Sequence, residues 1–130
     1  MFQPKSAFNG ASIKDVASAK TFYADTLGLD VHDDEMGLTV KLPGGGQLYL
    51  YPKGNHQPAT FTILNFVVDD IDTAAVELEK RGVKFERYEG MHQDEKGIAR
   101  GIAANMGPDI AWFTDPSGNI LAVLQEPPKK

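Results

Sequence analysis

Apolar and polar positions follow one order in the first half of the chain, and the same order returns in the second half. Each copy begins with an apolar strand that runs into an aspartate, Asp15 or Asp70. Apolar residues then recur at helical spacing until a glycine, Gly28 or Gly82, after which strands follow. A repeat of this size predicts two similar supersecondary units, with a ligand site favoured in the cleft between them.

Alternation and turn residues set the expected strands. The pattern predicts strands over residues 8–13, 29–31, 37–42, 47–51, 61–68, 83–88, 109–114 and 119–125. The two helices follow Asp15 and Asp70, whose carboxylates can accept from the free amides of a first helical turn. The fold class is therefore α+β, with helices on the outer face of the sheets. We expect one domain over 1–130, built from a βαβββ module at about 6–52 and another at about 60–126.

Composition narrows the function classes. The 130 residues are 42% hydrophobic and 24% charged, which is typical of one folded domain. The net charge of −5 argues against nucleic acid as a partner, because phosphates require a basic face. There is no cysteine, so disulfides, thiolate metal sites and cysteine nucleophiles are excluded. No signal peptide or membrane-spanning run is evident, and we expect a cytoplasmic protein without a membrane partner.

Three segments together resemble a known family. They are the run Asp15–Leu29, with its Phe-Tyr-x-x-x-Leu-Gly-Leu pattern, Val68–Asp72, and Trp112–Asn119, with its Asp-Pro-x-Gly-Asn turn. The chain resembles the vicinal oxygen chelate superfamily, which includes glyoxalase I, extradiol dioxygenases, and fosfomycin and bleomycin resistance proteins. The resemblance covers nearly the whole chain except residues 90–108. It implies two βαβββ modules with curved mixed sheets, a ligand cavity between the modules, and a homodimer.

The metal ligands of that superfamily have no counterpart in this sequence. Enzymes of the family hold a divalent metal with His, Glu or other oxygen ligands on four strands, and those positions fall on Phe8, Tyr49, Ile63 and Ala122. Phenylalanine, isoleucine and alanine offer no donor, and tyrosine rarely ligates such ions. We therefore expect no metal and no cofactor. The resemblance then favours the bleomycin resistance branch, a metal-free protein that sequesters or senses a small molecule.

Strand alternation indicates which residues face the cleft. Leu48 and Leu50 have the parity that packs under a helix, and the opposite parity faces the ligand. The predicted ligand-binding residues are Phe8, Ser12, Gln47, Tyr49, Tyr51, Phe61, Ile63, Asn65, Trp112, Ala122 and Leu124. This mixture suits a small apolar or aromatic molecule oriented by a few hydrogen bonds. Alternatively, these side chains fill the cleft as a second core, and the protein is a structural or interaction module.

Two histidines keep an enzymatic alternative open. His92 and His56 are candidates for a general acid or base, because histidine titrates near neutrality. Either could serve a glyoxalase-like lyase or isomerase, which could also use a metal at unforeseen positions. His92 belongs to the glycine-bearing segment Gly90–Pro108, which is either a lid or a mobile loop. Arg100 in that segment would bind an anionic ligand group or be an ordinary exposed arginine.

Overall fold

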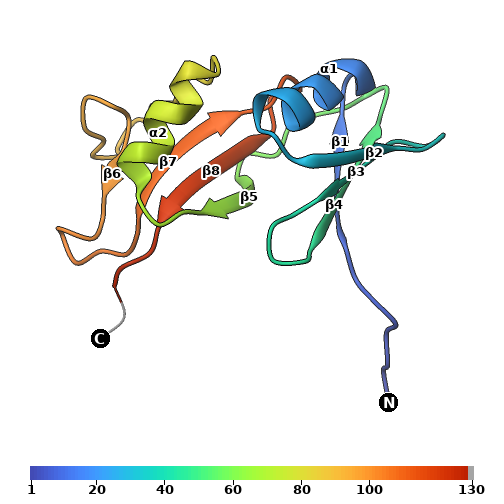
Figure 1. Cartoon of the computed structure of the whole chain (residues 1–130), viewed down its shortest axis with the longest axis horizontal. Helices are drawn as coiled ribbons and strands as arrows, with labels where there is room; N and C mark the ends of the chain where they lie inside the picture. The colour runs from blue at the N-terminus through green and yellow to red at the C-terminus, as the bar shows by residue number, and fades with distance from the viewer. Residues whose placement is uncertain (129–130) are drawn as a thin grey trace. The chain divides into compact units, whose positions relative to one another are not determined.

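Both aspartates that the sequence predicted as helix caps begin a helix in the structure. The structure is a computed structural model that describes residues 1–128, so residues 129–130 of the expected domain lie outside the described residues. The chain divides into a first unit, Met1–Pro58, and a second unit, Ala59–Lys130 (Figure 1). Each unit has one four-stranded mixed sheet and one helical segment, which confirms the α+β fold class.

The first unit has the expected βαβββ order. Its elements are β1 (Asn9–Ile13), α1 (Val16–Lys20), the π-helix η1 (Thr21–Thr26), β2 (Asp30–Asp33), β3 (Leu38–Lys41) and β4 (Gln47–Pro52). The sheet order is β1-β4-β3-β2, with β1 parallel to β4 and the other pairs antiparallel. One side of the sheet is buried, at Leu38, Val40, Leu48 and Leu50. The opposite parity, which includes Tyr49, forms the open face of this sheet.

The helical segment of the first unit is less regular than the sequence predicted. Asp15 caps α1, and its carboxylate accepts a hydrogen bond from the Ser18 amide at 2.9 Å. From Thr21 the turns widen, and the Leu27 amide donates to the Phe22 carbonyl five residues back. Gly28 then takes a positive φ of 73°, a backbone conformation that suits glycine, and the chain leaves the helix.

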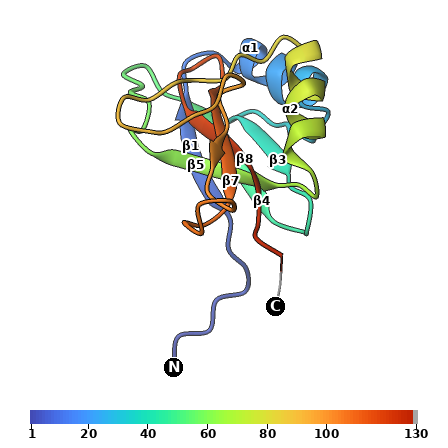
Figure 2. The same cartoon turned by 90° about the vertical axis from the view of Figure 1, so that its left-hand side faces the viewer.

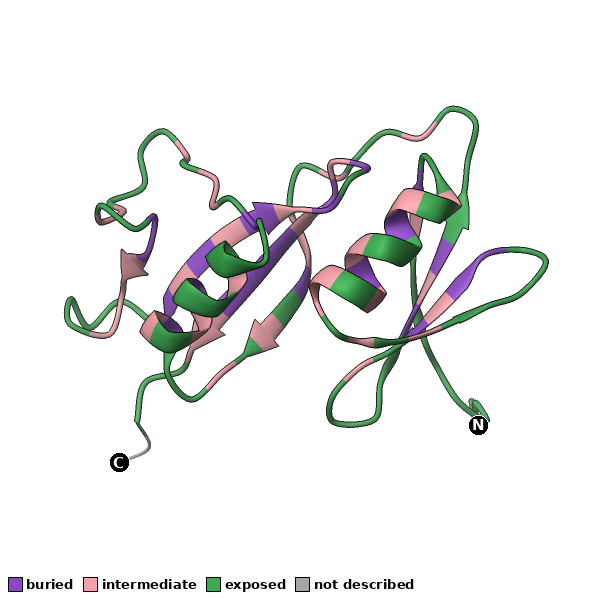
Figure 3. Ribbon diagram, turned by 45° about the horizontal axis from the view of Figure 1, so that its top comes forward, coloured by how far each residue is buried: buried purple, intermediate pink, exposed green. Residues whose placement is uncertain are grey.

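The second unit repeats this topology. Its elements are β5 (Thr62–Val67), α2 (Ile71–Lys80), β6 (Ala99–Arg100), β7 (Asp109–Thr114) and β8 (Ile120–Gln125), in the sheet order β5-β8-β7-β6. Asp70 caps α2 by accepting from the Asp72 amide at 3.2 Å and the Thr73 hydroxyl at 2.6 Å. The helix lies against β7 and β8 (Figure 2). Figure 3 shows buried residues on the helix and along both strands.

The strand predicted over residues 83–88 is not formed. The segment makes one backbone hydrogen bond to the sheet, from the Glu86 amide to the Trp112 carbonyl at 2.7 Å. Farther along the same edge of β7, the ladder is completed by β6, with Ala99 opposite Ile110. The prediction was wrong because two separate segments lie along the same edge of β7. The alternation of apolar and polar residues within 83–88 does not show that β6 also pairs with that edge.

Strand β5 contains an irregularity that alternation also could not predict. Thr62 pairs with Ile120 and Leu64 with Leu121, so Ile63 is an extra residue in the ladder. A bulge of this kind interrupts the strict alternation of faces. Thr62 consequently takes the place beside Ile120, whereas Asn65 returns to regular pairing opposite Ala122.

Candidate functional site

The open face of the second sheet presents a row of side chains across its three longest strands. The registers pair Asn65 with Ala122 and Ala122 with Trp112, so these three residues share one face. Ile120 and Thr62 form the neighbouring row. Ala122 is fully buried, whereas Asn65 is exposed and Trp112 is half-buried. The small alanine leaves the larger indole and the amide to shape the surface on either side.

A hollow of about 300 Å³ lies at this face. Trp112 and Ile120 line it from strands β7 and β8, and Phe61 lines it from the position just before β5. Tyr88 and Met91 form a second wall, and the remaining lining comes from Thr60 and Thr62. The lining is therefore aromatic and aliphatic, with a few hydroxyl groups. Such a surface suits a flat apolar molecule held by ring contacts and one or two hydrogen bonds.

Two aromatic side chains of the hollow meet edge to face. The rings of Tyr88 and Trp112 have centroids 5.5 Å apart and planes at 68°, a favourable geometry for an aromatic pair. Phe61 is 67% exposed, so most of its ring is available to a ligand. Desolvation raises the pKa of the Tyr88 phenol, and the nearby Glu86 carboxylate raises it further. The phenol is therefore a hydrogen-bond donor at neutral pH.

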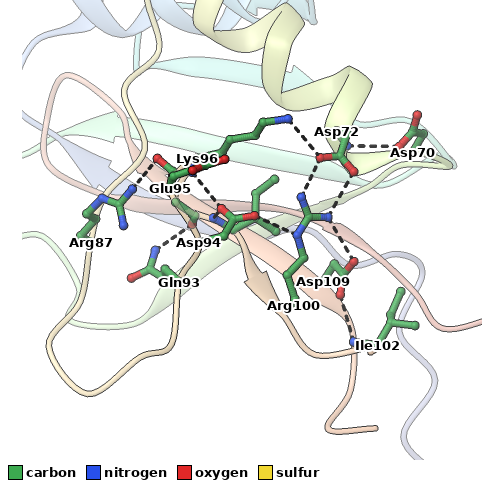
Figure 4. Close-up of polar contacts among 12 residues, drawn as sticks. Asp70, Asp72, Arg87, Gln93, Asp94, Glu95, Lys96, Arg100, Ile102 and Asp109 are labelled. Atoms are coloured by element: carbon green, nitrogen blue, oxygen red, sulfur yellow. Dashed lines mark hydrogen bonds and ion pairs between the residues drawn. The ribbon is translucent and has the colours of Figure 1, made fainter. Parts of the chain in front are cut away.

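Arg100, one of the candidates for anion binding, is engaged by acidic side chains of the protein itself (Figure 4). Its guanidinium donates to both carboxylate oxygens of Asp72 at 2.7 and 3.1 Å, and to Asp94 at 2.9 Å. Asp109 lies 3.5 Å away. The bond from Arg100 lowers the pKa of Asp72. Desolvation acts to raise the pKa of Asp94, but hydrogen bonds from the Ile98 amide and Arg100 lower it overall.

The open face of the first sheet carries a second aromatic group. The Phe8 and Tyr49 rings have centroids 6.3 Å apart in an edge contact, and Tyr49 and Tyr51 are 6.4 Å apart and nearly parallel. The Tyr49 hydroxyl donates to the Asp34 carboxylate at 3.3 Å. Desolvation and the charge of Asp34 raise the pKa of Tyr49. Phe8 is 65% exposed, and Gln47 belongs to the same face of this sheet.

The candidate acid–base residues are in different units. In the first unit, the Ser12 hydroxyl oxygen lies 2.6 Å from Nδ1 of His56, and Ser12 is paired with Tyr51 across the strands. In the second unit, His92 is exposed and adjoins Met91, a residue of the hollow. The structure thus gives His56 a polar partner.

The residues at the family's metal positions do not fit a metal. Phe8, Ile63 and Ala122 have no donor atom, and the Tyr49 hydroxyl is directed to Asp34. Within residues 1–128, no three His, Asp or Glu side chains are grouped so that they could hold a metal ion. The carboxylates of Asp72, Asp94 and Asp109 surround the guanidinium of Arg100, which supplies the positive charge between them.

Sequence reasoning identified part of the hollow. Phe61 and Trp112 line it, Asn65 and Ala122 continue the same face, and Leu124 is one row farther along β8. Ile63, at the bulge, is not among the lining residues. Thr60, Thr62, Tyr88 and Met91 were not predicted. The signal that could have suggested Met91 is the long segment 90–108 itself, which already stood out as a possible lid.

Comparisons with known proteins agree with this architecture. A family model described as the Glyoxalase/Bleomycin resistance protein/Dioxygenase superfamily matches residues 10–123. A crystal structure of a glyoxalase family protein from Bacillus anthracis is 18% identical and covers 97% of this chain and 99% of its own, with a TM-score of 0.66. No curated protein matches the sequence.

Two further solved structures are closer in sequence. TnmS3, an antibiotic binding protein from Streptomyces sp. CB03234, is 25% identical over 96% of this chain and 99% of its own, with a TM-score of 0.64. A superfamily member from Sphaerobacter thermophilus is 28% identical over 93% of this chain and 98% of its own, also with a TM-score of 0.64.

Proposed function

Because the chain belongs to the Glyoxalase/Bleomycin resistance protein/Dioxygenase superfamily, we propose that it is a binding protein for a small apolar or aromatic molecule. The observation that carries the proposal is the hollow of about 300 Å³, whose walls are the rings of Phe61, Tyr88 and Trp112. Its size is at the lower end of ligand pockets, which suits a compound of one to three rings. The likeness to an antibiotic binding protein, TnmS3, supports the same class of function.

In the proposed function, the protein binds its ligand without a metal ion. The family's metal positions carry no suitable donors, so polarisation of a substrate by a bound cation has no support in the residues present. What these residues can do is exclude water from a flat ligand and donate a hydrogen bond from Tyr88 or a threonine. Binding, rather than turnover, is the function that such a lining favours.

We propose also that the protein is a cytoplasmic homodimer. Support for the dimer comes from large apolar side chains that the chain leaves exposed, among them Phe8, Phe61 and Val67, which are all at least 60% exposed. The lack of cysteine is compatible with a reducing compartment. Among the described residues, the helices are too short and too polar to cross a bilayer.

Energy transfer from tryptophan tests the binding proposal directly. Trp112 is the only tryptophan of the chain, so its emission reports on the hollow alone. Dansyl amide, a neutral aromatic probe that accepts energy from tryptophan, is expected to bind and to show sensitised emission. Phe61→Ala should weaken its binding roughly fivefold, since an aromatic contact contributes about 1 kcal/mol.

The matched control is Phe2→Ala. Phe2 is 89% exposed and is not among the residues that line the hollow. We expect Phe2→Ala to leave the affinity for dansyl amide within a factor of two of the wild type. Equal affinities of the wild type and Phe61→Ala would rule out the hollow as the binding site.

A further inference from the structure

One wall of the hollow is fixed by side-chain hydrogen bonds rather than by a strand. Tyr88 and Met91 lie in a turn, in which the Met91 amide donates to the Tyr88 carbonyl at 3.1 Å. The Tyr88 amide, in turn, donates to Oε1 of the Gln93 side chain at 2.9 Å. A sheet ladder would distribute such bonds over several residues. Here the Gln93 carboxamide provides the side-chain acceptor for the Tyr88 amide, and the Gln93 backbone forms an isolated bridge with Ala99.

The Gln93 carboxamide uses both its donor and its acceptor groups. Besides accepting from Tyr88, its Nε2 donates to the Glu86 carbonyl at 2.9 Å and to the Gly97 carbonyl at 2.8 Å. The side chain is half-buried. Only an amide can accept at one atom and donate twice at the other. Gln93 therefore joins the strand-like residues before the wall to the turn that follows it.

Arg100 connects this turn to the helix. One oxygen of Asp94 accepts from the Lys96 and Ile98 amides, both at 2.9 Å, and the other accepts from Nε of Arg100. The remaining guanidinium nitrogens bind Asp72 at the start of α2 (Figure 4). Bidentate arginine–carboxylate pairs are directional as well as strong. The turn that carries Gln93 is thereby attached to an element of the core.

We propose that Gln93 and Arg100 are positioning residues that set the place of the 88–91 wall and so determine which ligands the hollow accepts. The proposal rests on the proposed function, in that the hollow is taken to be the ligand site. With both residues in place, Tyr88 is kept edge-on to Trp112 and the hollow admits flat, compact molecules. Release of either contact lets the wall move away from Trp112, which widens the hollow and lowers its selectivity.

The decisive variant is Gln93→Glu. It keeps the size of the side chain and the acceptor for the Tyr88 amide, but the introduced carboxylate cannot donate to the Glu86 and Gly97 carbonyls. The two carbonyl oxygens that face this carboxylate favour its protonated form, in which it regains one of the two donors. At neutral pH we expect the 88–91 wall to move away from Trp112, and on acidification we expect it to return in part. A protein that is only destabilised would not show this pH profile.

The position of the wall is measured without any ligand. At pH 7, Gln93→Glu should speed hydrogen exchange of the Glu86 amide, which donates to the Trp112 carbonyl, roughly tenfold and shift the emission of Trp112 to longer wavelength. On acidification both signals should return toward wild-type values. Gln57→Glu, the same change at an exposed position of the first unit, should show neither effect. Amides of β7 and β8 should stay protected in all variants, which establishes that the unit is folded.

A second variant keeps the test independent of how well the first one folds. Arg100→Lys preserves the charge but loses the forked contact with Asp72 and Asp94, and it should speed exchange of the Tyr88 amide by a few-fold. Affinity for dansyl amide is then measured for each variant. Wild-type exchange and emission in both variants would overturn the proposal, and so would unchanged dansyl amide affinity. Absence of dansyl amide binding to the wild type, with altered exchange in the variants, would instead refute the proposed function alone.

Discussion

The two units share the same strand order and differ in the segments that connect their strands. Each unit has the strand order 1-4-3-2 of its own strands and a helix capped by an aspartate, Asp15 or Asp70. In the first unit, β2 and β3 pair regularly over four residues. In the second, only two residues of β6 pair with β7, and the long segment before β6 supplies a wall of the hollow. The repeat supplies the sheet, and the departure from the repeat supplies one wall of the hollow.

The polar contacts of the two units differ in the same way. In the first unit, Asp34 organises a short turn by accepting from the Met36 and Gly37 amides and from Tyr49. In the second, Gln93, Asp94 and Arg100 organise the longer segment that leads into the two-residue strand β6. A site built from side-chain bonds is easier to alter by substitution than one built on a strand, because each bond has few substitutes.

The largest expected effects come from one glycine in each unit. A Cβ at Gly37 would collide with the Leu50 carbonyl, and a Cβ at Gly101 would collide with the Pro108 carbonyl. Backbone atoms cannot move aside as a side chain can, so Gly37→Ala and Gly101→Ala should each lower the free energy of unfolding by about 3 kcal/mol. Urea unfolding gives the loss, and hydrogen exchange shows which unit is affected.

The two glycine substitutions should also differ in which amides lose their protection from hydrogen exchange. Gly37→Ala should expose amides of β2, β3 and β4, whereas Gly101→Ala should first expose the segment that precedes β7. Gly54→Ala is the control, since no atom lies within 4 Å of its added Cβ. If Gly37→Ala were as stable as Gly54→Ala, the close approach of Gly37 to the Leu50 carbonyl would be refuted.

A smaller effect is expected from acid, and it should depend on Arg100. The pKa values of Asp72 and Asp94 are lowered in the folded protein, so their contribution to stability is present above about pH 4 and is lost as pH falls through the lowered values. Arg100→Met removes the cation that keeps these carboxylates ionised. The loss of unfolding free energy between pH 7 and pH 3 should shrink on the order of 1 kcal/mol, since the pairs are partly exposed.

Urea unfolding at the two pH values checks this expectation. Lys20→Met serves as the control in the first unit, because it removes an ion pair with Asp33 of 3.0 Å whose partners are both about half exposed. Its pH dependence should stay close to that of the wild type. An equal loss between pH 7 and pH 3 in the wild type and in Arg100→Met would show that Arg100 does not stabilise the ionised aspartates.

Features set by neighbouring residues could be predicted from the sequence. Asp15 and Asp70 were identified as caps because a cap needs only its own first turn, and Gly28 because a helix end needs a positive φ there. Trp112 was assigned to the predicted ligand face, and it shares one face of its sheet with Asn65 and Ala122. Each of these inferences uses contacts or periods that span fewer than about ten residues.

Features set by competition between distant segments could not be predicted. Whether residues 83–88 form a strand depends on what else pairs with β7, and the position of Tyr88 depends on three bonds made by Gln93. Ile63 leaves the regular ladder because β5 and β8 shift register between Thr62 and Leu64. None of these contacts produces a repeating pattern of apolar and polar residues in the sequence. The capped helices and most of the strands were therefore predictable from the sequence, whereas much of the hollow's lining was not.

The smallest expected effect compares one tyrosine from each unit. Desolvation raises the pKa of both Tyr49 and Tyr88, with Asp34 adding to the shift in the first unit and Glu86 in the second. A raised folded pKa contributes stability below the ordinary value of about 10, and that contribution is lost as pH rises through the folded value. Tyr49→Phe and Tyr88→Phe should each remove one late step from the alkaline absorbance titration, and Tyr88→Phe should change the free energy of unfolding by about 0.5 kcal/mol at neutral pH. Since Tyr88 lies on the wall and Tyr49 on the regular sheet, Gln93→Met, which removes the hydrogen bonds of Gln93 without adding a charge, should shift the step lost in Tyr88→Phe to lower pH and leave the Tyr49 step in place. A shift of both steps, or of the Tyr49 step alone, would mean that Gln93 does not act on the wall of the second unit specifically.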